Sequence, residues 1–146
     1  MRSLKRLLHV PKAERQLLFE AAFIILTVCI MLRWLTLGNV QRALADISMG
    51  WRSHNACSAD RIAWAIQKAA SSLADSNCLV QALAGQALLV RYGYESLVTI
   101  GVAKAIGIAK DGCDRFAAHA WVTCENEVVI GGGGTANYTA LLNLGS

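Results

Sequence analysis

Proline and charge are both scarce in this chain, and their scarcity limits the kind of protein it can be. Pro11 is the only proline, and 16% of the 146 residues are charged against 55% that are hydrophobic. A disordered or linker-rich protein needs the opposite balance, so both classes are excluded. The length fits one domain with a real core. The apolar excess fits either a membrane protein or a soluble protein whose partners cover part of its surface.

Paired cysteines are also lacking. No two cysteines form a Cys-x-x-Cys pair, and an odd count without regular spacing makes a poor disulfide framework. His54 and Cys57 alone are too few ligands for zinc, so we expect neither a metal nor a cofactor. Free thiols are expected in a reducing compartment, which favours the cytoplasm. The five cysteines are Cys29, Cys57, Cys78, Cys113 and Cys124.

Net charge is confined to the N-terminal end. Residues 1–15 hold five basic residues against Glu14, which gives +4, and the whole chain is also +4, so the remaining residues sum to zero. A basic segment of this kind suits an acidic partner or an anionic lipid surface, and a solvated, frayed terminus is an equal alternative. It is too short and too poor in aromatic residues to indicate nucleic-acid binding.

One long apolar run needs an interpretation. It extends from Ala21 to Leu32 and is closed by Glu20 and Arg33, so it contains 12 residues. A transmembrane helix needs about 20, and no small-residue cleavage site follows that would indicate a signal peptide. The run therefore favours a buried or interfacial helix over a membrane anchor, and it allows peripheral contact with a membrane.

Periodicity predicts helices first and strands afterwards. Helices are expected at 12–34, 39–49, from Ser58 or Asp60 to about 75, and 78–92, with Gly93 as a left-handed cap. Strands are expected at 95–104, 118–124 and 127–130, with a loop at 105–116 and a tight turn at Glu125-Asn126. This order predicts an α+β fold. We expect one compact domain, with an apolar helical region at 1–55 and the core at 56–146.

Cys78 and His119 are the residues most suited to chemistry. Asn77 precedes Cys78 as a capping residue, and the exposed amides and positive dipole of a helix start stabilise a thiolate. His119 begins a predicted strand, which would hold an imidazole rigidly enough to act as its base. On position alone, both residues can equally be ordinary core or strand-end side chains.

The short sequence blocks around these two residues favour a catalytic role for them. A Cys-Leu-x-Gln-Ala block at 78–82 is followed by Arg-Tyr-Gly-Tyr at 91–94, Ile-Gly-Val-Ala at 100–103 and His-Ala-Trp-Val at 119–122. This order resembles the leader peptidases of lasso peptide biosynthesis, which belong to the transglutaminase-like superfamily. The resemblance extends from the apolar N-terminal helix to the glycine-rich tail that contains residues 138–141.

The resemblance implies a papain/transglutaminase-like fold and a cysteine peptidase, with Cys78 as nucleophile and His119 as base. It implies removal of the leader from a ribosomal precursor peptide, so that a partner lasso cyclase can close the ring on the freed amine. In the short, split form of these proteins a separate small protein recognises the leader. This chain has no spare segment for such a module, so it resembles the split form.

The resemblance also implies a third catalytic residue, usually an aspartate, and here the chain departs from the family pattern. The family's aspartate follows the histidine by about twelve residues, which falls on Gly131. Asp114 and Asn137 are substitutes by type, and a backbone carbonyl or a water can also hold the imidazole. Counting outward from the turn places His119 opposite Gly132. An aspartate introduced at Gly131 or Gly132 is then expected to be tolerated or to raise activity.

The oxyanion and the reaction type stay open. The backbone amide of Cys78 is the expected oxyanion donor, because a helix start leaves it unpaired, and Gln81 is a second candidate. A thiol acyl transferase would use the same Cys-His dyad with an acceptor other than water. A non-catalytic assembly subunit of the maturation complex is the alternative that the absent carboxylate favours.

Overall fold

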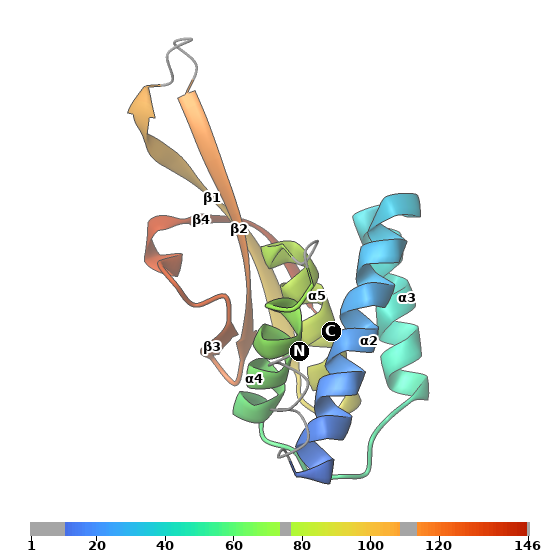
Figure 1. Cartoon of the computed structure of the whole chain (residues 1–146). Helices are drawn as coiled ribbons and strands as arrows, with labels where there is room; N and C mark the ends of the chain where they lie inside the picture. Colours follow the sequence, from blue (N-terminus) through green and yellow to red (C-terminus); the bar gives the residue numbers. More distant parts are fainter. Residues whose placement is uncertain (1–10, 74–76, 109–113, 146) are drawn as a thin grey trace.

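The molecule consists of helices and a small antiparallel sheet, which confirms the predicted α+β fold (Figure 1). The computed structural model describes residues 11–73, 77–108 and 114–145. The helices are α2 (Lys12–Trp34), α3 (Leu37–Gly50), α4 (Ala59–Ala70) and α5 (Cys78–Arg91). The strands are β1 (Ser96–Ile108), β2 (Asp114–Cys124), β3 (Glu127–Ile130) and β4 (Thr139–Gly145), and a short 3-10 turn, η1 (Thr135–Asn137), precedes β4.

The helix predictions are confirmed with small shifts at the ends. The first helix has the predicted bounds, and α3 begins two residues earlier than expected. The expected end of α4 near residue 75 is wrong, because the helix stops at Ala70. Gly93 has φ +89°, the left-handed conformation predicted for it after α5.

The four strands lie in the order β3-β2-β1-β4, and all neighbouring pairs are antiparallel. Glu125 and Asn126 have φ of +51° and +67°, which two-residue hairpin turns require. Cys124 pairs with Glu127 across this turn, which is the pairing that the predicted turn at Glu125-Asn126 implies. The short hairpin is therefore fixed by local chemistry.

Two parts of the sheet differ from the prediction. The loop expected at 105–116 is wrong at both ends, because β1 continues to Ile108 and β2 begins at Asp114, so these strands form a long hairpin. The tail after the glycines contains β4, which was not expected and which pairs with β1. Both differences arise from pairing between strands, which supplies hydrogen bonds that no local pattern displays.

The core lies where α5 packs against the helices on one side and the sheet on the other (Figure 1). Gly85 lets α5 approach closely, because a Cβ at this position would overlap the side chain of Ile130. The buried amide of Gln86 donates to the carbonyl oxygens of Ser96 at 3.3 Å and Leu144 at 2.8 Å. Helix α5 is thus hydrogen-bonded to both β1 and β4.

A buried ion pair joins α2 and α5, the first and the last of the described helices along the chain. Glu20 of α2 accepts from Arg91 at the end of α5, at 3.2 and 3.3 Å, and from the hydroxyl of Tyr92 at 3.0 Å. The same guanidinium donates to the carbonyl of Trp51 and lies 4.0 Å from its ring centroid. The pairing explains how a glutamate is accommodated on the buried face of an apolar helix.

Candidate active site

Cys78 is the first residue of α5. The side chain of Asn77 accepts a hydrogen bond from the amide of Val80 at 3.0 Å, so the predicted cap is present. The thiol is half-buried and in no disulfide. The cap satisfies one of the first amides of the helix, while the amide of Cys78 has no acceptor within the helix by geometry. The helix start therefore offers a thiol and an oxyanion donor at one residue.

Cys78 faces the sheet. It precedes Gly85 by seven residues, which places both on the same side of α5, and a Cβ on Gly85 would overlap the side chain of Ile130 of β3 and lie 3.9 Å from that of Val122 of β2. Seven helical residues span about 10 Å, and three strand residues also span about 10 Å. The start of α5 and His119, which precedes Val122 by three residues, therefore lie at similar distances from the place where Gly85 packs against Val122.

Three groups contact the imidazole of His119. Its Nε2 lies 2.7 Å from the carbonyl oxygen of Gly131. Its ring stacks on Trp121 at a centroid distance of 6.1 Å and lies 5.2 Å from the ring of Tyr138. A carbonyl oxygen only accepts, so Nε2 carries the proton in the neutral ring and Nδ1 keeps its lone pair. The tautomer that results is the one in which Nδ1 can act as a base.

The segment between β3 and β4 covers this histidine. Because β3 and β4 lie at opposite edges of the sheet, residues 131–138 cross one of its faces, and the contacts of Tyr138 with His119 and Trp121 show which face. Gly131 has φ +75°, and a Cβ there would lie 2.7 Å from the carbonyl oxygen of Ala120. Glycine is therefore required where the segment leaves β3 and presents its carbonyl to the imidazole.

The thiol and the imidazole approach from different faces of β2. Val122 faces α5, and side chains alternate along a strand, so His119 is directed to the opposite face with Trp121. Within the described residues no hydrogen bond joins the Cys78 thiol to the His119 ring. The β3 ladder ends at the Val122–Ile130 pair, so β2 has no β3 partner at His119. The thiol and the imidazole could therefore meet only around the edge of β2 that β3 leaves unpaired.

The other predicted site residues lie apart from the imidazole. Asp114 starts β2, five residues before His119 and so about 17 Å along the strand; its side chain is outside the described part. Asn137 is exposed in η1, and among the described contacts it has no hydrogen bond to His119. Gln81 is half-buried one turn after Asn77. The partner at Nε2 is the Gly131 carbonyl, one of the possibilities left open by the sequence.

Two neighbours of the imidazole were missed at the sequence level. Tyr138 was noted only as part of the tail, and its role depends on the crossing segment, which no local pattern reveals. Gly101 pairs with His119 across the β1–β2 ladder, and a Cβ there would lie 2.8 Å from the Trp121 ring. A glycine within a β-branched strand is the signal that could have indicated a closely packed aromatic side chain.

Other titratable groups are less suited to nucleophilic chemistry. Burial raises the pKa of the Cys57 thiol, with Arg61 opposing and Glu20 adding to the shift. Burial also raises the pKa of the Cys124 thiol, to which Glu125 adds. Cys113 lies outside the described residues. Across the described part of the chain, no three His, Cys, Asp or Glu side chains gather as a metal site.

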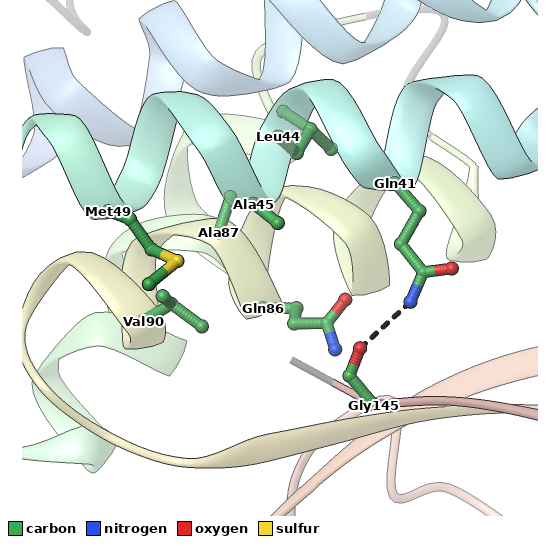
Figure 2. Close-up of a pocket in the computed structure, with 8 residues that line it drawn as sticks. All are labelled: Gln41, Leu44, Ala45, Met49, Gln86, Ala87, Val90 and Gly145. Atoms are coloured by element: carbon green, nitrogen blue, oxygen red, sulfur yellow. Dashed lines mark hydrogen bonds between the residues drawn. The ribbon is translucent and has the colours of Figure 1, made fainter.

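A small hollow elsewhere does not compete as a site. It lies between α3, the C-terminal half of α5 and the end of β4, where Gln41 donates to the carbonyl of Gly145 at 2.9 Å (Figure 2). Its volume is about 40 Å³, far below the several hundred Å³ of small-molecule sites. None of the residues that line it belongs to the Cys78–His119 region.

The fold and the two positioned residues define a class of protein: an α+β domain with a thiol at a capped helix start and a histidine on the adjacent sheet. The sequence model of the transglutaminase-like superfamily matches residues 24–143, so the chain belongs to this superfamily. Cysteine peptidases and acyltransferases are typical of its members. No curated protein and no solved structure matches the chain.

Proposed function

We propose that this protein is a cysteine peptidase that removes the leader from a ribosomal precursor peptide during lasso peptide maturation. Membership of the transglutaminase-like superfamily supports the reaction class. The blocks around Cys78 and His119 support the substrate, through their resemblance to lasso leader peptidases. The observation that carries the proposal is the contact of His119 Nε2 with the Gly131 carbonyl at 2.7 Å, because it leaves Nδ1 as the base.

In the proposed reaction, His119 Nδ1 takes the proton of the Cys78 thiol and the thiolate attacks the scissile carbonyl. The Cys78 amide donates to the oxyanion, with Gln81 as the second candidate. The imidazolium protonates the leaving amine, which is the new N-terminus of the core peptide. A water deprotonated by His119 then hydrolyses the acyl-enzyme and releases the leader as a free acid.

The structure puts one requirement on this mechanism. The thiol and imidazole must meet at the edge of β2 beyond Val122, since alternation directs His119 away from the α5 face. Hydrogen bonds between catalytic groups often tighten only when substrate binds. A carbonyl also stabilises an imidazolium less than a carboxylate does, so we expect a slower enzyme than one with a complete triad.

The chain is proposed to act with partners. Positioning of the substrate supplies much of a peptidase's advantage, and we propose that a separate small leader-recognition protein provides it by raising the local concentration of precursor. The freed amine would pass to a lasso cyclase in the cytoplasm. A precursor titrated against the chain alone should bind weakly, and tight binding without a partner would contradict the split arrangement.

The direct test uses the purified chain, the precursor and the leader-recognition protein. Cys78→Ala should abolish cleavage without unfolding the protein, whereas Cys124→Ala, the matched control, should lower stability more than rate. The mass of the released leader separates two readings: a free acid indicates hydrolysis, and a conjugate indicates acyl transfer. Cleavage at the wild-type rate by Cys78→Ala would exclude Cys78 as nucleophile.

A non-catalytic assembly subunit is the second candidate. Two observations favour it: glycine occupies the family's carboxylate position, and no hydrogen bond joins Cys78 to His119 within the described residues. A thiol-reactive mimic of the precursor distinguishes the two functions. Trapping at Cys78 that depends on His119 supports the peptidase, and absence of trapping while the chain still stimulates the cyclase supports the assembly subunit.

A further inference from the structure

The outer face of α2 carries an unusual row of large apolar side chains. Phe19, Phe23, Leu26 and Ile30 follow at three- and four-residue spacing, which places them on one side of the helix, and they are between 48% and 71% exposed. Trp34 continues the row and is 83% exposed. We call these five residues the apolar stripe. It is about 22 Å long, since it covers fifteen helical steps.

The end of α3 widens this surface. The ring of Trp51 makes an edge-to-face contact with Phe23 at a centroid distance of 6.3 Å. Ile47, near the end of α3, is also 49% exposed. A contiguous apolar surface of this kind marks an interaction site rather than ordinary exposed residues.

Charge indicates what covers the stripe. Lys12 and Arg15 precede it and Arg33 adjoins its last residue, Trp34, all at helical positions on the same side as Phe19. The two acidic residues of the helix lie elsewhere: Glu14 pairs with Arg61 of α4 at 3.1 Å, and Glu20 is buried against Arg91. Along α2 the stripe is therefore bordered by cations, and neither acid of this helix lies on it.

Cations at both ends, aromatic side chains along the row and tryptophan at its rim fit the interface of an anionic bilayer. We propose that the apolar stripe of α2 binds the surface of an anionic membrane, with the helix lying in the plane of the interface. The basic residues of the first fifteen positions supply further attraction to anionic headgroups. The proposal does not depend on the peptidase activity.

The same structure argues against a spanning helix, although α2 is long and apolar enough to cross a membrane by length and composition. Its inner face contributes Leu17, Ala21, Ile25 and Val28 to the core, each at most 3% exposed. Insertion across a bilayer would remove these side chains from α4 and α5. It would also break the Glu20–Arg91 pair.

The test measures binding of the full chain to vesicles of phosphatidylcholine, with and without phosphatidylglycerol, by co-sedimentation. We expect binding that requires phosphatidylglycerol, weakens with salt, and is reversed by alkaline carbonate. Phe23→Glu combined with Ile30→Glu should lower the partition coefficient at least about tenfold. Lys12→Gln and Arg15→Gln should each lower it about fivefold on anionic vesicles.

Trp64→Glu is the matched control, because Trp64 is an exposed aromatic residue on α4 and outside the stripe. It should leave partitioning unchanged, and circular dichroism should show every variant folded. Equal binding to neutral vesicles, no binding, or an equal loss with Trp64→Glu would overturn the proposal. Retention in the membrane after carbonate treatment would also overturn it, in favour of a spanning helix.

Discussion

Substituting Gly131 by alanine tests the arrangement around His119 most directly. Gly131 has φ +75°, and an alanine in this left-handed conformation costs about 1–2 kcal/mol. Its Cβ would lie 2.7 Å from the carbonyl oxygen of Ala120 and 3.2 Å from the Cα of Trp121, both on a paired strand that cannot move freely. We therefore expect the free energy of unfolding to fall by about 2–3 kcal/mol in total.

The same clash should displace the Gly131 carbonyl from Nε2. A misplacement of about 1 Å can cost about a hundredfold in rate, so cleavage by the folded variant should fall by about ten- to a hundredfold. Gly133→Ala is the matched control, since its Cβ would meet nothing within 4 Å and its backbone is not in the positive-φ region. It should leave both stability and rate nearly unchanged.

Urea unfolding gives the stability change, and cleavage is compared at equal concentrations of folded protein. Imidazole nitrogen NMR gives an independent readout, because the protein should show the Nε2-protonated tautomer and the Gly131→Ala variant a mixture. A folded Gly131→Ala variant with wild-type rate and an unchanged tautomer would refute the idea that this carbonyl orients His119. An equal loss in Gly133→Ala would refute the assignment to Gly131.

Three further predictions concern the helices. Glu20→Leu should lower the free energy of unfolding by about 3–5 kcal/mol, because Arg91 would stay buried without its acid; urea unfolding checks this, and Glu20→Leu with Arg91→Leu should recover part of the loss. Burial raises the pKa of Tyr92 most, and its hydrogen bond to Glu20 adds to the shift. The neutral hydroxyl therefore stabilises the fold fully at pH values below the ordinary pKa of 10.0. That stability should be lost as the pH rises through the raised pKa, and Tyr92→Phe, followed by urea unfolding against pH, should lack this loss. Asn77→Ala should cost about 0.5–2 kcal/mol by removing the cap, and should slow alkylation of Cys78 if the first turn frays.

The parts of the fold that follow from the sequence are those with local causes. The Asn77 cap, the left-handed Gly93 and the turn at Glu125-Asn126 each depend on a few neighbouring residues, and all three were predicted. Strand β4 and the long β1–β2 hairpin were not, because they depend on pairing with distant segments. The sequence therefore predicted the fold class, the helix start of the candidate site and the strand of His119, but not β4 or the crossing segment that covers the histidine.

The position of Gly131 illustrates the same limit. Counting from the turn placed His119 opposite Gly132, but the register shifts between Val122 and Thr123, so the count is wrong and the ladder stops at Ile130. The expectation that an aspartate at 131 is tolerated is contradicted by the positive φ and the clash with Ala120. At Gly132 the nearest atoms to an added Cβ are 3.5 Å away, so a substitution there stays compatible with the fold.

The crossing segment also determines when, during synthesis of the chain, the surroundings of His119 are completed. During synthesis α5 and β2 emerge before residues 131–138, and β4 follows every other described element. The carbonyl of Gly131 directly follows β3 and is placed by the β2–β3 hairpin, whereas the Tyr138 ring reaches the imidazole only when β4 closes onto β1, a pairing between residues far apart in sequence. A nascent chain without β4 would expose Cys78 and a His119 ring that Tyr138 does not yet cover. Maturation of the site is in this way tied to completion of the sheet.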